Sequence, residues 1–189
     1  MPNLNQARNI GGVGAILTIL SFVPSAGPVL SIIGFVLVLL ALKWISEIVQ
    51  NPDIFRNALI AVVVTIVGVV VGAVVGGVGF LSVLTGMGPG GPGEVNFFQL
   101  LTTIVVAVIV VWIFAVISSV FFRRALYLTA DSLNVKMFRT AGLLIFIGAI
   151  LTIIIVGAVV SLVGNILLAV AFFQIPVGPP PPPPPPPSA

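Results

Sequence analysis

Long apolar stretches that are nearly free of charged side chains fill this sequence, and they restrict the possible folds more than any other feature. Only 6% of the 189 residues are charged, whereas soluble proteins use roughly a quarter of their residues as charged side chains to cover the surface. A transmembrane helix needs about 20 mostly apolar residues. The sequence therefore predicts an all-α, polytopic membrane helix bundle and excludes a soluble domain.

Breaks rich in Pro, Gly or polar residues divide the apolar sequence into six predicted transmembrane helices. Pro24 and Pro28 interrupt the first apolar region, and Asn51-Pro52-Asp53 is a typical helix start. The break at Gly157 is the weakest, and only an internal repeat supports it. The expected helices cover residues 7–23, 29–48, 52–84, 97–128, 137–156 and 158–174, within one transmembrane domain of residues 1–176.

An internal repeat relates the first two predicted helices to the last two. Residues 14–19 have the sequence Gly-Ala-Ile-Leu-Thr-Ile, and residues 148–153 repeat it. After a four-residue contraction, six further identities follow in the same register, from Gly27 aligned with Gly157 to Ala41 aligned with Ala171. Two spans separate the copies, so we expect a parallel repeat of two helical hairpins. The repeat also favours a retained first helix over a cleaved signal peptide.

Basic residues fall on one side of the predicted spans. If both chain ends lie on that side, it receives all seven Lys and Arg residues, while the opposite side receives Glu94 and no base. Loops rich in Lys and Arg remain in the cytoplasm. We therefore expect a multi-pass protein of the cell membrane with both termini cytoplasmic and residues 86–93 outside.

Glycines four residues apart, at Gly68, Gly72 and Gly76, share one face of the third predicted helix. Such a face allows another helix to approach closely where no hydrophobic effect drives association. The partner is a helix of the same bundle, the interpretation that we prefer, or a helix of another subunit. The repeated hairpins contain the same spacing and are expected to pack equivalently, at Gly27, Ser31, Gly157 and Ser161.

Polar side chains near the middle of a span often mark a transport pathway, and those of this chain are uncharged. Hydroxyl groups in helices commonly donate to their own backbone four residues back, which gives them a structural role. The hydroxyl candidates are Thr18, Ser31, Thr65, Ser118, Thr152 and Ser161. An amide satisfies itself less easily, so we expect Asn165 to form an interhelical hydrogen bond or, alternatively, to line a pathway.

Aromatic residues precede arginines at three predicted span ends, a pattern that suits the membrane headgroup region. The basic residues at these ends are Arg56, Arg123, Arg124, Lys136 and Arg139. We expect them to anchor the protein at the cytoplasmic face. The alternative is a basic ring that binds an anionic lipid or a partner.

The third and fourth predicted helices are longer than a bilayer requires. At 1.5 Å per residue, 33 residues reach roughly 49 Å, against a hydrocarbon core of about 30 Å. We expect these helices to tilt or to project into the cytoplasm. The projecting ends would then form the soluble surface, with Asp53, Arg56, Arg123, Arg124, Tyr127 and Asp131.

Residues 177–189 form a polyproline C-terminal tail with nine consecutive prolines, and Pro179, Pro183 and Pro187 mark its length. Such a run adopts a polyproline II rod of roughly 28 Å at 3.1 Å per residue. The tail either docks on an aromatic groove of a partner protein or is a stiff extension without a partner.

Several blocks of this chain resemble a mainly archaeal membrane family catalogued as Domain of Unknown Function 996. The blocks are residues 4–8, 11–15, 41–43, 54–57, 138–142 and 171–176, with sequences such as Gly-Gly-Val-Gly-Ala and Ala-Phe-Phe-Gln-Ile-Pro. The resemblance implies an integral membrane protein without an assigned activity. The loop at residues 86–93 and the proline tail depart from the family pattern.

The composition excludes most enzyme chemistry, because the chain has no Cys and no His. It therefore lacks a thiolate nucleophile, an imidazole base and the usual zinc ligands. We expect a non-enzymatic protein with no cofactor, no metal and no nucleic-acid partner. We favour a structural or accessory subunit of a homo- or hetero-oligomeric membrane assembly, which acts through helix packing, contacts with membrane lipids and the tail. The alternative is a passive channel or transporter for a small solute.

Overall fold

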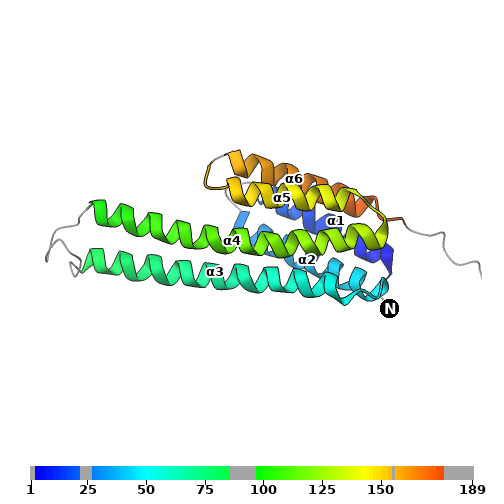
Figure 1. Cartoon of the computed structure of the whole chain (residues 1–189), viewed down its shortest axis with the longest axis horizontal. Helices are drawn as coiled ribbons and strands as arrows, with labels where there is room; N and C mark the ends of the chain where they lie inside the picture. Colours follow the sequence, from blue (N-terminus) through cyan, green and yellow to red (C-terminus); the bar gives the residue numbers. More distant parts are fainter. Residues whose placement is uncertain (1–2, 22–26, 86–96, 155, 177–189) are drawn as a thin grey trace, which may run out of the picture.

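A computed structural model describes residues 3–21, 27–85, 97–154 and 156–176 of the chain. These residues form α-helices and no strands, which confirms the predicted all-α class (Figure 1). The loop at residues 86–93 and the polyproline tail lie outside the described residues. The helices are α1 (Leu4–Leu20), α2 (Gly27–Ile48), α3 (Pro52–Leu84), α4 (Phe97–Leu133), α5 (Met137–Leu151) and α6 (Val156–Phe173).

The helices differ greatly in length. Within the described residues, α2, α3, α4 and α6 are long and apolar enough to cross a membrane. The 17 residues of α1 and the 15 residues of α5 reach only about 25 and 22 Å, short of a hydrocarbon core of about 30 Å. The described residues therefore form six helices, of which four are long enough to cross a membrane, and the prediction of six transmembrane spans stays a prediction.

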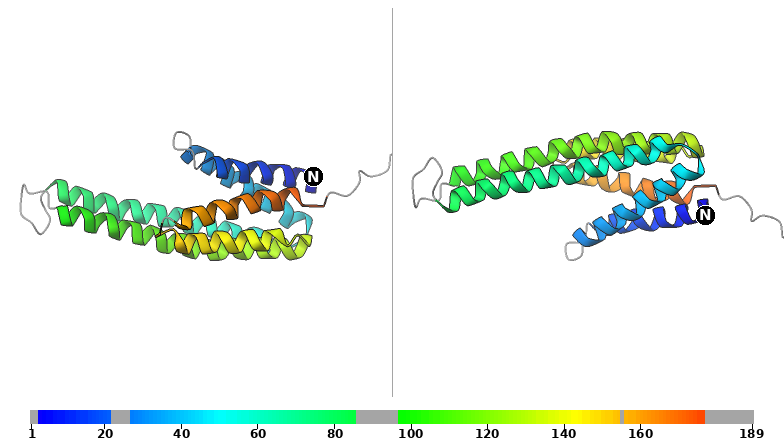
Figure 2. Two further views of the ribbon diagram at one scale, coloured as in Figure 1. Left: turned by 90° about the horizontal axis from the view of Figure 1, so that it is seen from above. Right: turned by 90° about the horizontal axis from the view of Figure 1, so that it is seen from below.

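The helices form a closed ring. Each helix contacts the next one along the chain, and α6 contacts α1. Figure 2 shows that the α1–α2 hairpin tilts away from the other helices toward its tip. At the opposite end, the start of α1 lies beside the end of α6 and beside the α2–α3 and α4–α5 turns (Figure 1). We call this the charged end, because all seven Lys and Arg residues lie near it along their helices.

The buried core lies at the charged end and is built largely from small residues. Ala41, Ala58, Ala125, Ala141 and Ala171 are fully buried there, one from each of α2 to α6. Small side chains let helix backbones approach closely, which is how helices associate without a hydrophobic driving force. Large side chains then fill the remaining space, and the rings of Phe138 and Phe172 meet edge to face with centroids 5.1 Å apart. The ring of helices is thus tightly closed at this end.

The projection of α3 and α4 is not at the charged end, where the sequence led us to expect it. Both helices extend beyond the others at the opposite end (Figures 1 and 2). At the charged end, Ile54 of α3 and Leu126 of α4 are fully buried, so this part belongs to the core. At the far end, Val78 and Phe97 are 63% and 66% exposed. The projecting part is therefore apolar, and α4 runs five residues past its predicted end because Thr129 and Ala130 are buried in the core.

The glycine face of α3 lies against α4. A Cβ atom added at Gly68, Gly72 or Gly76 would meet the side chains of Phe114, Val111 or Ala107 in turn. These glycines therefore allow close packing within one hairpin of the same chain.

The two repeated hairpins use glycines in different registers. Gly14 of α1 lies against the backbone of Gly34 in α2, whereas Gly148 of α5 lies against Ser161 of α6. Ser161 aligns with Ser31, three residues before Gly34, so the contact moves by about one helical turn. The expected equivalence of Ser31 and Ser161 is therefore wrong. The repeat alignment has a four-residue contraction between these positions, and this contraction accounts for the shift.

At the hairpin turns, Gly27 and Gly157 do correspond. Each lies in the first turn of its helix and leaves room for the end of the preceding helix, at Ser21 and Leu151 respectively. The ring closes through a further glycine contact, in which Gly11 and Gly12 of α1 receive the rings of Phe172 and Phe173 of α6.

Candidate functional site

A cavity of about 870 Å³ lies inside the ring of helices, and all six helices contribute to its wall. Its base contains the core residues Phe122 and Leu168. Its mouth contains Ile32, Ile66 and Ile153, which are 68%, 57% and 57% exposed, so the cavity opens away from the core. The α1–α2 hairpin, which contributes Thr18, Ile32 and Val36 to the wall, is splayed from the other helices (Figure 2).

The cavity brings together every mid-span polar residue that the sequence analysis singled out. All of them line one space although they come from five helices and the residue that follows α5, and no charged side chain lines it with them. The residues are Thr18, Ser31, Thr65, Ser118, Thr152, Ser161 and Asn165. The cavity is thus apolar, with a few uncharged polar groups, as is typical of small-molecule sites.

Two of these hydroxyls make the same bond in the two repeated hairpins. The Thr18 hydroxyl donates to the Gly14 carbonyl oxygen at 3.0 Å, and the Thr152 hydroxyl donates to the Gly148 carbonyl oxygen at 2.7 Å. This is the bond to the chain's own backbone that is common for Thr in helices.

A second pair of hydroxyls joins α3 to α4. The Ser118 hydroxyl donates to the Ala61 carbonyl oxygen at 2.8 Å, and the Thr65 hydroxyl also reaches this oxygen, at 2.9 Å. The two hydroxyl oxygens lie 2.7 Å apart. A hydrogen-bonded cluster therefore crosses the α3–α4 interface at the cavity wall.

Asn165 forms no interhelical hydrogen bond within the described residues. Its Nδ2 donates to the Ser161 carbonyl oxygen at 2.9 Å, within α6 itself. The Asn165 side-chain amide therefore finds an acceptor on its own helix, whereas we expected its partner to lie on another helix. The Asn165 amide oxygen and the hydroxyls of Ser31 and Ser161 have no hydrogen-bond partner in the described part of the chain, and all three residues line the cavity.

Trp112 of α4 is a cavity residue that the sequence analysis did not select. Its indole Nε1 lies 3.1 Å from the Ala149 carbonyl oxygen and 3.2 Å from the Ile150 carbonyl oxygen. Both carbonyls belong to the last turn of α5, whose final four carbonyls have no partner within an ideal helix. Trp112 therefore caps α5 from a neighbouring helix. A buried indole N–H usually finds an acceptor, and this tendency was the available signal.

The same capping is completed by groups near the end of α5. The Thr152 hydroxyl bonds the Gly148 carbonyl, as described above, and the Ile154 amide donates to the Leu151 carbonyl at 2.8 Å. All four terminal carbonyls of α5 thus accept a hydrogen bond. This explains why α5 ends at Leu151, five residues before its predicted end.

Ser119 of α4 is a second cavity residue that was not predicted from the sequence. Its hydroxyl donates to the Val116 carbonyl oxygen at 2.7 Å.

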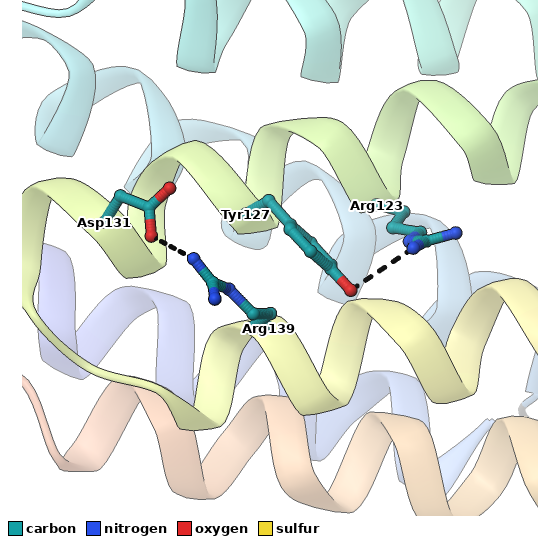
Figure 3. Close-up of polar contacts among 4 residues, drawn as sticks. All are labelled: Arg123, Tyr127, Asp131 and Arg139. Carbon is teal, nitrogen blue, oxygen red and sulfur yellow. Dashed lines mark hydrogen bonds and ion pairs between the residues drawn. The ribbon is translucent and has the colours of Figure 1, made fainter.

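At the charged end, two of the predicted basic residues are held by neighbours (Figure 3). Arg139 of α5 pairs with Asp131 of α4 at 2.5 Å. Tyr127 lies between Arg139 and Arg123, whose guanidinium carbons are 5.3 and 5.0 Å from the centre of its ring. Arg123 also approaches the ring of Phe146 at 5.2 Å. These cation–π contacts and the ion pair join α4 to α5.

Nothing in the described residues suggests a metal centre, because no three Asp or Glu side chains gather there. The cavity itself contains no acid or base. The cavity wall thus presents uncharged hydrogen-bonding groups within an apolar surface.

Comparison with known proteins gives a family but no activity. Residues 30–166 match the family described as "Protein of unknown function (DUF996)". The chain is also similar to an uncharacterized protein, MJ1644, of Methanocaldococcus jannaschii, with 35% identity over 179 residues. This alignment covers 92% of the chain and 93% of the relative. No solved structure matches the chain.

Proposed function

The chain belongs to the family of unknown function DUF996, and we propose that it is a non-enzymatic membrane protein that binds a small uncharged solute between its helices. One observation carries this proposal: eight Ser, Thr and Asn residues from distant parts of the chain line one cavity of about 870 Å³. Ligand sites in proteins typically have volumes of about 300 to 1,000 Å³ and combine apolar walls with a few polar groups.

The proposed membrane orientation places the charged end in the cytoplasm of the cell, with both termini there. The seven basic residues at that end support it through the positive-inside rule. The proposed parallel repeat is supported by the matching Thr18 and Thr152 bonds. At 1.5 Å per residue, Ser118 lies about 8 Å from Arg123 along α4, and Thr152 about 20 Å from Arg139. The cavity then lies within the hydrocarbon core.

The cavity wall indicates the chemistry of the solute. Charged ligands are disfavoured, because no charged side chain is present to offset their desolvation. The Asn165 amide oxygen and the Ser31 and Ser161 hydroxyls offer hydrogen bonds to an otherwise apolar molecule. The closed core at the charged end means that passage to the cytoplasm requires the helices to move. We therefore propose a carrier or a binding protein for the solute and not a permanently open channel.

Flux through reconstituted vesicles tests this function. Vesicles that contain the wild-type protein should take up a small uncharged amphiphilic solute faster than empty vesicles, with no change in ion flux. Asn165→Leu and Thr152→Val should reduce this flux. Thr102→Val is a matched control, because it removes the same hydroxyl bond to a carbonyl four residues back, on the projecting part of α4 outside the cavity. Equal flux with and without the protein would contradict the proposal.

A structural or accessory role in an oligomer is the second candidate, and the projecting apolar part of α3 and α4 favours it. Val74, Val78, Leu81 and Phe97 are exposed there, beyond the reach of the other helices. A helix of another protein or of a second copy would cover them. Native purification in mild detergent distinguishes the candidates: an assembly that survives Asn165→Leu, without solute flux in wild type, would support the structural role.

A further inference from the structure

A smaller pocket of about 300 Å³ lies between α3 and α4 at the charged end, separate from the central cavity. Arg56 of α3 and Arg124 of α4 both line it, together with the apolar side chains of Ile60 and Phe121. The pocket therefore combines two basic residues with apolar side chains. Both α3 and α4 are needed to form it.

The two arginines of this pocket differ from those in Figure 3, because neither has a hydrogen-bond or ion-pair partner among the described residues. Arg123 and Arg139 contact Tyr127 or Asp131. Arg56 and Arg124 make no ion pair or hydrogen bond with any residue that the structure describes, and both are exposed. Asp53 lines the same pocket but forms no ion pair with either arginine among the described residues, so both guanidinium groups keep donors that can bind an anion. Arginine in particular binds phosphate and carboxylate oxygens with two parallel N–H donors.

On both helices an apolar side chain lies on the inner side of the arginine, and on α4 Leu128 adds a second apolar group on the outer side of Arg124. Along α3, Ile60 follows Arg56 by one turn, about 6 Å closer to the middle of the bundle. Along α4, Phe121 precedes Arg124 by three residues, about 4.5 Å closer to the middle. A ligand that fills this pocket therefore needs a negative group at the level of the arginines and an apolar chain that continues past Ile60 and Phe121.

We propose that this pocket binds the phosphate group of an anionic membrane phospholipid, with an acyl chain against Ile60 and Phe121. Asp53 lies one turn outside Arg56 and also lines the pocket, at the level where the alcohol part of a lipid headgroup extends. Its carboxylate accepts hydrogen bonds from hydroxyl groups there. A free phosphate ion would use the arginines but not the apolar wall, so the geometry favours the lipid.

Lipid retention by the full-length protein tests the proposal. The probe is phosphatidylglycerol, titrated into the purified protein in phosphatidylcholine nanodiscs or followed by native mass spectrometry. Arg56→Gln with Arg124→Gln should weaken phosphatidylglycerol binding about tenfold or more, since each charge-assisted hydrogen bond lost is a strong one. The matched control is Lys43→Gln with Lys136→Gln, which removes two positive charges at the same end but outside the pocket.

Three results would overturn the proposal. An equal loss in the lysine control would show that overall surface charge, and not the pocket, attracts the lipid. Displacement of phosphatidylglycerol by inorganic phosphate at similar concentration would show a free-anion site. Full retention by the Gln variants would show that the arginines do not bind it. Arg56→Lys with Arg124→Lys keeps the charge and the anchoring, so an intermediate weakening is expected even if the Gln variants fold poorly.

Discussion

Replacing Trp112 with Phe should lower the free energy of unfolding by about 1 to 2 kcal/mol, because it removes the cap on the last turn of α5. The indole N–H serves the Ala149 and Ile150 carbonyls, at 3.1 and 3.2 Å. If Leu151 lies about 18 Å from Arg139, as its 12-residue separation implies, these carbonyls are inside the hydrocarbon core. No water replaces the lost donor there.

The magnitude follows from two limits. Hydrogen bonds between helices in membranes contribute about 0.6 kcal/mol on average and up to about 1.7 kcal/mol. A buried carbonyl left without a donor costs about 1 to 3 kcal/mol. Phe keeps an aromatic ring in the cavity wall, so the lost packing is small. Unfolding by sodium dodecyl sulfate in mixed micelles, followed by circular dichroism, measures the change.

The second tryptophan of the chain provides the control. Trp44 of α2 is half-buried like Trp112, but its indole N–H has no hydrogen-bond partner in the described residues. Trp44→Phe therefore removes the same atoms without removing a cap. Equal destabilisation by the two substitutions would refute the capping argument. Hydrogen exchange provides a second readout. The exchange rates of amides near Leu151 should increase in Trp112→Phe and should stay at the wild-type value in Trp44→Phe.

Three other predictions concern packing and orientation. Gly72→Leu should destabilise the protein by about 1 to 3 kcal/mol through overpacking against α4. The control Val71→Leu should be tolerated. Equal yields of the two folded variants in size-exclusion chromatography would contradict the close packing at Gly72. Gly11→Val should loosen α1 from α6, because its side chain meets a phenylalanine ring, and an unchanged melting temperature would argue against that contact. In intact cells an impermeant thiol reagent should label Thr85→Cys but not Ser132→Cys, and the reverse pattern would invert the proposed orientation.

The helices were predictable because their signals are local. Asn51-Pro52-Asp53 starts α3 at Pro52, and the scarcity of charge requires an apolar bundle. The end of α5 was not predictable, because the sequence after Leu151 remains apolar and the cap comes from Trp112 on another helix. The end of α4 was predicted too early for a related reason. Thr129 is a polar residue near a loop, and the sequence does not show that tertiary packing buries it.

The candidate site was predictable as a set of residues but not as a geometry. The mid-span hydroxyls and Asn165 were identified from depth and polarity alone, and the structure places them around one cavity. Their partners depend on contacts between distant parts of the chain, such as Ser118 with Ala61. Asn165 bonds within α6, which its residue type argued against. Whether a basic residue finds an ion-pair partner likewise depends on the fold: Arg139 pairs with Asp131 of α4, whereas Asp53 shares a pocket with Arg56 and Arg124 without pairing with either.

The unequal helix lengths give the protein two hydrophobic thicknesses in a single molecule. From the basic residues, α5 extends about 18 Å and α4 about 39 Å, and a bilayer of about 30 Å matches neither. Lipids beside the short hairpins must compress, and those beside the long hairpin must stretch or the hairpin must tilt. Each ångström of mismatch costs a fraction of a kcal/mol. A change of bilayer thickness that relieves the mismatch at one hairpin therefore increases it at the other, so no single bilayer thickness fits the whole molecule.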